Sequence, residues 1–119
     1  MAKRVLIIDD ESGFCEVVKD ILHEVGYEVD APHHLASAVG IALAGNYDLI
    51  ILDLRMPGID GVEIARLFQK KRLLTPILVI SGYLTDTVPQ QLKSLGIHHV
   101  LPKPSDVPQL QHAVASAMA

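Results

Sequence analysis

The segment YDLIILD, residues 47–53, decides the fold. Its centre, Leu49 to Leu52, is apolar at every position, and it stops at the acid Asp53. A strand with one exposed face alternates apolar and polar residues, whereas a strand buried on both faces is apolar throughout. We therefore predict that residues 49–52 form a central strand of a parallel sheet.

Four more apolar runs accompany this one, and stretches with helical spacing lie between them. The predicted strands are Arg4 to Ile8, Tyr27 to Ala31, Leu49 to Leu52, Ile77 to Ile80 and Ile97 to Leu101. The predicted helices carry these apolar stripes: Phe14, Val18, Ile21, Leu22 and Val25; Leu35, Ala38, Val39 and Ala42; Val62, Ala65 and Phe68; Val88, Leu92 and Leu95; Val107, Leu110 and Val114. Strands that alternate with helices need crossovers, and crossovers give parallel pairing. We therefore predict a doubly wound α/β fold, (βα)₅, with a five-stranded parallel sheet and helices on both faces.

Composition limits the kind of protein. The 119 residues are enough for one hydrophobic core, so we expect a single domain over residues 1–119. Half of the residues are hydrophobic and 20% are charged, which favours a packed core over disorder. No apolar run is long enough to span a membrane, and the single cysteine, Cys15, fits a reducing cytoplasm. The formal net charge of −4 argues against direct nucleic-acid binding.

Polar residues follow four of the predicted strands, at the point where each strand ends. They are Asp9-Asp10-Glu11, Asp53, Ser81-Gly82 and Lys103-Pro104. In open parallel sheets the carboxyl ends of the strands form the edge at which ligands bind. Asp10 or Glu11 alone would more simply be a residue of a helix N-terminus. That reading explains neither an apolar strand that ends on Asp53 nor a lysine at the end of strand five, so we predict one polar site.

The acids of this site require a cation. Clustered carboxylates repel one another, and their pKa values rise unless a cation neutralises them. Mg²⁺ suits best, because it takes oxygen ligands and typically binds through one or two carboxylates plus a phosphate. Three carboxylates, Mg²⁺ and Lys103 sum to zero formal charge. A phosphoryl group on Asp53 would therefore need new donors, and Ser81 could be one of them.

In this order and on these strand ends, the motifs resemble the receiver domains of two-component response regulators over Lys3 to Met118. The matching segments are Asp9-Asp10-Glu11, the stretch DLRMPGIDG at residues 53–61, Ser81-Gly82 and Leu101-Pro102-Lys103-Pro104. The resemblance implies the flavodoxin-like strand order 2-1-3-4-5. It also implies a cytoplasmic phosphorelay protein that is not a conventional enzyme but catalyses its own phosphorylation and dephosphorylation.

The resemblance implies partners for the chain. A sensor histidine kinase or a phosphotransfer protein would donate the phosphoryl group. An effector that the sequence does not identify would bind the face formed by helix four, strand five and helix five. Nucleic acid and membrane are not expected partners of this domain, and phosphorylation could produce a dimer.

The resemblance also assigns a phosphoacceptor and a metal site. Asp53 would attack the phosphohistidine of the partner. Mg²⁺ would be bound by Asp10, by Asp9 partly through water, by Asp53 and by the backbone carbonyl of Arg55.

The remaining matches would bind the phosphoryl group. Lys103 would neutralise the phosphoryl oxygens, and Ser81, with Gly82 beside it, would hydrogen-bond one of them after transfer. Pro104 would fix the loop after strand five through a cis bond following Lys103.

One position departs from the family pattern, and two others are positions at which the family varies. Val100 stands where the family usually has Tyr or Phe, which puts its coupled aromatic switch in question. The output change would then use backbone shifts of the strand-four loop and helix four, or another side chain, for which Tyr83 is the nearest aromatic. Arg55 and Tyr83 occupy the positions that flank the phosphoryl group and govern the access of water, although Tyr83 could equally be an exposed loop tyrosine.

Other reactive side chains carry no predicted site. His33-His34 and His98-His99 are neighbours in sequence, and neighbours do not face the same way on a helix or a strand, so we do not expect them to chelate a metal. We place Cys15 on the side of the first helix away from the apolar stripe that contains Phe14 and Val18, where it would be exposed.

Three alternatives to a stand-alone receiver remain at this point. The chain could be the excised receiver of a longer DNA-binding response regulator or hybrid kinase. A phosphatase of the haloacid dehalogenase type also uses Asp and Mg²⁺, but its second Asp follows the nucleophile by two positions, and Asp9-Asp10-Glu11-Ser12 does not match. A pseudo-receiver would bind a partner without phosphorylation, which the intact acids, Asp53 and Lys103 argue against.

Overall fold

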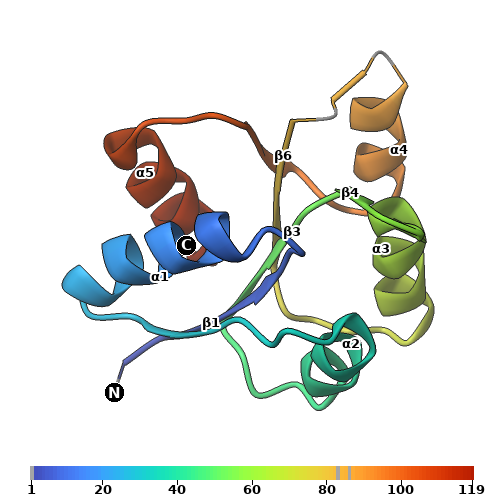
Figure 1. Ribbon diagram of the computed structural model, residues 1–119. Helices are drawn as coiled ribbons and strands as arrows, with labels where there is room; N and C mark the ends of the chain where they lie inside the picture. Colours follow the sequence, from blue (N-terminus) through green and yellow to red (C-terminus); the bar gives the residue numbers. More distant parts are fainter. Residues whose placement is uncertain (1, 83, 86) are drawn as a thin grey trace.

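The apolar run Leu49–Leu52 forms β3, the central strand of a five-stranded parallel sheet in the computed structural model (Figure 1). The structure describes residues 2–82, 84–85 and 87–119. The elements are β1 (Arg4–Ile8), α1 (Ser12–Glu24), β2 (Glu28–Asp30), α2 (Leu35–Leu43), β3 (Leu49–Leu52), β4 (Arg55–Met56), β5 (Ile59–Asp60), α3 (Gly61–Lys70), β6 (Ile77–Ser81), α4 (Val88–Ser94), β7 (His99–Pro102) and α5 (Val107–Met118). The sheet order is β2-β1-β3-β6-β7. The predicted fold class and strand order are confirmed, with β6 and β7 as the fourth and fifth predicted strands.

Alternate residues of the central strands face two separate layers of the core. Leu49 and Ile51 of β3 pack with α1 and α5, whereas Ile50 and Leu52 pack with α2, α3 and α4. Figure 1 shows these two groups of helices on opposite sides of the sheet. Both faces of β3 are therefore covered, which is why its sequence is apolar without alternation.

Several boundaries differ from the sequence predictions. The second strand is Glu28–Asp30 rather than Tyr27 to Ala31, and the fifth is His99–Pro102 rather than Ile97 to Leu101. The fourth strand continues one residue beyond Ile80 to Ser81. Both of the strands whose limits move most are edge strands, where pairing on one side only leaves the ends weakly defined.

The predicted apolar stripe of α1 is wrong by part of a turn. Cys15 is 7% exposed and packs with Val18 and Leu22, so these three residues form the buried face. Val25 lies just beyond the last helical residue and is 51% exposed. The prediction that Cys15 would be exposed is therefore incorrect, because α1 packs against the sheet with the face that carries residues 15, 18 and 22.

We expect the Cys15 thiol to be nearly inert in the folded protein. Burial, with a smaller contribution from the charge of Asp9, raises the pKa of Cys15 to about 11. Only the thiolate reacts, so a thiol reagent at pH 8 should label the folded protein at least about a hundredfold more slowly than the urea-unfolded chain. Equal labelling rates in the two states would show that the thiol is accessible.

A short hairpin that was not predicted joins β3 to α3. Arg55 pairs with Asp60 and Met56 with Ile59, in antiparallel register. The hairpin brings the chain back to the end of β3, where the backbone N–H of Gly61 donates to the carbonyl oxygen of Leu54 at 2.8 Å. The first residue of α3 is thus packed directly on the strand end that carries Asp53.

The described helices include none that is both long and apolar enough to cross a membrane.

Candidate functional site

Three carboxylates meet at the carboxyl edge of the sheet. Asp9 and Asp10 follow β1, and Asp53 follows β3; one oxygen from each lies within 4.8 Å of the others. Asp9 and Asp53 are buried, with exposures of 7% and 3%, while Asp10 is open to solvent. Among the described residues this is the only such group of three or more potential metal ligands, and neither histidine pair belongs to it.

The strand ladder fixes the position of Asp53. Its backbone N–H donates to the carbonyl oxygen of Ile8 at 3.0 Å, which continues the pairing of β1 with β3 beyond Leu52. On the other side, Gly61 leaves no space for a side chain, since an added Cβ would lie 2.5 Å from the Cα of Leu54 and even closer to the carbonyl oxygen of Asp53. The carboxylate is therefore carried on a backbone that is held from both sides.

Lys103 brings a cation to the same three-carboxylate group. Its Nζ lies 2.8 Å from Asp9 Oδ2, 2.9 Å from Glu11 Oε1 and 3.6 Å from Asp53 Oδ2. Its backbone N–H donates to the carbonyl oxygen of Ser81 at 3.0 Å, so the ends of β6 and β7 are tied together. The bond between Lys103 and Pro104 is cis, as the resemblance implied.

Electrostatics keeps the lysine charged. Burial by itself lowers the pKa of Lys103, but the hydrogen bonds to Asp9 and Glu11 outweigh it, and the pKa lies above its usual value. Burial raises the pKa of Asp9, and the neighbouring charge of Asp53 adds to the rise; hydrogen bonds from Lys103 and from the Glu11 backbone N–H offset part of it. For Asp9, burial and the charge of Asp53 thus outweigh the stabilisation that Lys103 and the Glu11 backbone give to the charged carboxylate.

The donor set fits Mg²⁺. All three ligand atoms are carboxylate oxygens, which this hard cation prefers. The exposure of Asp10 leaves room for the waters that Mg²⁺ keeps in protein sites. The carboxylates of Asp9, Asp10 and Asp53 could therefore bind a partly hydrated Mg²⁺ ion.

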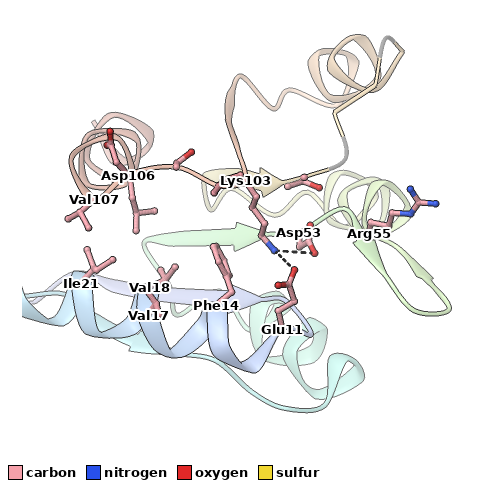
Figure 2. Close-up of a pocket in the computed structure, with 15 residues that line it drawn as sticks. Glu11, Phe14, Val17, Val18, Ile21, Asp53, Arg55, Lys103, Asp106 and Val107 are labelled. Carbon is pink, nitrogen blue, oxygen red and sulfur yellow. Dashed lines mark hydrogen bonds and ion pairs between the residues drawn. The ribbon is translucent and has the colours of Figure 1, made fainter.

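Asp53 and Lys103 border a hollow of about 640 Å³. Asp53, Arg55, Ser81, Gly82, Lys103 and Pro104 line one part of it (Figure 2). The rest is lined by apolar residues of α1 and α5 and by the polar residues Glu11, Ser105 and Asp106, which lie just before the two helices. The structure thus brings these six predicted residues to one place. Figure 2 shows the Arg55 guanidinium directed away from Lys103. Tyr83 lies outside the described residues, and Val100 is 36% exposed on the edge strand β7.

Two contacts of Lys103 were not predicted. Glu11 was grouped with the acids but without a role, and Phe14 was assigned only to the apolar stripe of the first helix. In the structure Glu11 forms an ion pair with Lys103, and the Lys103 Nζ lies 4.1 Å from the centroid of the Phe14 ring. Their spacing of three residues at the start of a helix was the available signal, since residues i and i+3 share a helix face.

Comparisons with known proteins agree with this geometry. A family model of the response regulator receiver domain matches residues 5–115. The uncharacterized transcriptional regulatory protein YkoG of Bacillus subtilis is 28% identical over 116 residues, which are 96% of this chain and 50% of YkoG. Sporulation initiation phosphotransferase F of the same organism is 26% identical over 114 residues, covering 96% of this chain and 92% of that protein. The structure of the chemotaxis protein CheY4 of Vibrio cholerae matches with a TM-score of 0.87 and 27% identity, covering 98% of this chain and 99% of that one.

The chain spans only part of several of its relatives. It covers 50% of YkoG, 32% of ResD of Bacillus subtilis and 34% of TcrA of Mycobacterium tuberculosis. The family model nevertheless covers all five strands of the sheet except the first residue of β1. Receiver domains act in signalling by two-component systems and are not conventional enzymes. This chain belongs to the response regulator receiver domain family.

Proposed function

We propose that the chain accepts a phosphoryl group on Asp53 in a reaction that depends on Mg²⁺. The proposal rests on the environment of the Asp53 carboxylate. One oxygen of this carboxylate lies within 4.8 Å of a carboxylate oxygen of Asp9 and of Asp10, and its Oδ2 lies 3.6 Å from the Lys103 Nζ. A carboxylate nucleophile between a metal-binding acid pair and a cation is suited to phosphoryl transfer, which depends mainly on positioning and charge neutralisation.

The residues of the site have separate roles in this proposal. An Asp53 oxygen attacks the phosphorus of a phosphohistidine; the new O–P bond forms as the P–N bond breaks, and the electron pair leaves with the imidazole nitrogen. Lys103 binds phosphoryl oxygens, and the Ser81 hydroxyl donates to one of them after transfer. Asp9, Asp10 and the carbonyl of Arg55 would hold Mg²⁺, which neutralises charge on the transferring group when it is bound.

The proposal extends to partners and output. A histidine kinase or phosphotransfer protein would be the donor, and the face of α4, β7 and α5 would bind the effector or a second phosphorylated copy. Nucleic acid would be contacted by other parts of a longer regulator rather than by this domain, whose net charge is −4. We place the protein in the cytoplasm, where such donors occur.

Phosphorylation stoichiometry tests the function. The protein is incubated with Mg²⁺ and a small acyl-phosphate or phosphoramidate donor, and intact mass is followed together with phosphate release. The expected result is a Mg²⁺-dependent gain of one phosphoryl group per chain. Rapid release of many equivalents of phosphate would favour a phosphatase, and the absence of any adduct would favour a pseudo-receiver.

Asp10→Asn should weaken Mg²⁺ binding by at least about tenfold, because it removes a charged ligand from a site with few protein ligands. The measurement is a Mg²⁺ titration followed by calorimetry or by amide chemical shifts. Asp20→Asn is the matched control, since Asp20 is an exposed acid of α1 outside the carboxylate group. Unchanged affinity in the Asp10 variant would place the metal elsewhere.

The acyl phosphate should last for minutes or longer. Hydrolysis needs a water in line with the bond to Asp53, and neither Arg55 nor Tyr83 can act as a base for that water. Once negative charge appears, the exposed Arg55 side chain could rotate toward the phosphoryl oxygens and cover them. Replacing Arg55 by Asn and Tyr83 by Ser should speed dephosphorylation by about tenfold, equal to about 1.4 kcal/mol in the barrier.

The control for lifetime is Arg66→Asn, which removes an exposed arginine of α3 that pairs with Glu63. Decay of the phosphorylated protein is followed by intact mass after the donor is removed. Loss of the phosphoryl group from wild type within seconds, or equal decay in the double variant, would refute shielding by these two side chains.

A further inference from the structure

The ammonium group of Lys103 is bound by an aromatic ring as well as by carboxylates. Its Nζ lies 4.1 Å from the centroid of the Phe14 ring. Figure 2 shows Phe14 and Glu11 pointing toward Lys103 from the same end of α1. A cation at this distance over a ring face is attracted by the negative face of the π-system. The lysine is therefore held from the α1 side by Phe14 of the first helical turn and by Glu11, the residue just before the helix.

The three carboxylates that bind the ammonium group would each hold it less firmly during the proposed reaction. Asp9 belongs to the carboxylate group that could bind Mg²⁺, so a metal ion would compete with Lys103 for its oxygens. The Glu11 side chain is 62% exposed, and ion pairs in that environment are weakened by water and salt. Asp53 is the group that changes its own chemistry.

The contact with the Phe14 ring is not subject to metal competition, screening of charge or chemical change. It carries no charge, binds no Mg²⁺ and takes no part in the transfer. The Lys103 side chain is only 14% exposed, so the contact is partly withdrawn from water, where a cation–π interaction is stronger than at a fully exposed site. Phe14 also lines the hollow that contains Asp53 and Ser81, which places the ring beside the reacting group.

We propose that Phe14 is a positioning residue for Lys103. Its ring keeps the ammonium group beside Asp53 when Mg²⁺ takes the carboxylate oxygens, so that phosphoryl oxygens meet a cation already in place. The use of Lys103 in transfer rests on the proposed function, but its placement by Phe14 can be tested without any phosphorylation.

Two variants distinguish the effect of the aromatic ring from that of apolar packing. Phe14→Leu removes the ring but keeps an apolar side chain against the core between the sheet and helices α1 and α5. Phe14→Tyr keeps the ring, and its added hydroxyl can extend into the adjoining hollow. The first readout is the NMR signal of the Lys103 ε-methylene protons, assigned through its loss in Lys103→Arg. The ring current should shift this signal upfield in wild type and in Phe14→Tyr, with and without Mg²⁺, and the shift should disappear in Phe14→Leu.

The second readout is phosphorylation by a small phosphodonor in the presence of Mg²⁺. The rate at subsaturating donor should fall about two- to fivefold in Phe14→Leu, the range that corresponds to one cation–π contact at a partly exposed site, and should stay near wild type in Phe14→Tyr. Denaturant midpoints of the three proteins show whether any loss of rate reflects loss of fold.

Two results would overturn the proposal. One is a Lys103 ε-methylene signal with the same shift in wild type and Phe14→Leu. The other is a loss of rate in Phe14→Tyr as large as that in Phe14→Leu, which would assign the effect to packing. Failure of wild type itself to be phosphorylated would instead contradict the proposed function, and the Lys103 signal would still decide where the ammonium group lies.

Discussion

Asp53→Asn is expected to abolish the acyl phosphate. An amide has nearly the same shape as a carboxylate, but it lacks the charged oxygen that attacks phosphorus, so no adduct should form with any donor concentration that saturates wild type. The measurement is intact mass after incubation with a small phosphodonor and Mg²⁺. Asp20→Asn, which changes an exposed acid of α1, should be phosphorylated like wild type.

The Asp53 variant should remain folded. Removing the charge of Asp53 relieves its repulsion with Asp9 but also removes its attraction to Lys103, so the two effects oppose each other and the free energy of unfolding should stay close to that of wild type. Urea unfolding checks this before the phosphorylation result is interpreted. An adduct of equal yield on the folded Asn variant would mean that another residue accepts the phosphoryl group.

Gly61→Ala should destabilise the protein by about 3 kcal/mol, at the upper end of the usual cost of overpacking. The new methyl group would lie 2.5 Å from the Cα of Leu54 and would collide with the carbonyl oxygen of Asp53. Both neighbours are backbone atoms next to a buried central strand, so they cannot move aside cheaply. The strain also falls on the backbone that carries Asp53, and phosphorylation of the remaining folded protein should slow as well.

Gly40→Ala is a matched control for this substitution. Gly40 lies within α2, and a Cβ added there meets nothing within 4 Å. Alanine favours a helix interior over glycine, so this variant should be more stable than wild type by about 0.5–1 kcal/mol. Urea unfolding of both variants measures the difference, and a Gly61 variant as stable as wild type would show that the contact between α3 and the end of β3 is looser than described.

The parts of the fold that follow from continuous burial could be predicted from the sequence. Leu49 to Leu52 could be predicted as a central strand, because a strand covered on both faces is apolar without alternation and a run of four residues is short for a helix. The parallel order then placed Asp53, Ser81 and Lys103 at one edge. The site could therefore be anticipated from the ends of strands, where a change from apolar to polar residues is easy to see.

The parts that depend on tertiary packing could not be predicted. The hairpin of Arg55–Met56 and Ile59–Asp60 has strands of two residues each, too short to show any periodicity. The burial of Cys15 depends on how α1 is rotated against the sheet, and residues near the margin of an amphipathic stripe do not define that angle. The contact of Phe14 with Lys103 joins residues that are far apart in sequence, and it is decided by the packing of α1 beside the end of β7.

The central claim is that Asp53 carries the phosphoryl group, and the most direct test is to locate the modified residue chemically. Borohydride reduces an acyl phosphate to the alcohol, so treating the phosphorylated protein converts the modified aspartate to homoserine, and peptide mass spectrometry then reads its position. We predict homoserine at position 53 in the Mg²⁺-treated sample and none at positions 9 or 10. Homoserine at either of those positions, or at none of the aspartates of a protein that has gained a phosphoryl group, would contradict the account.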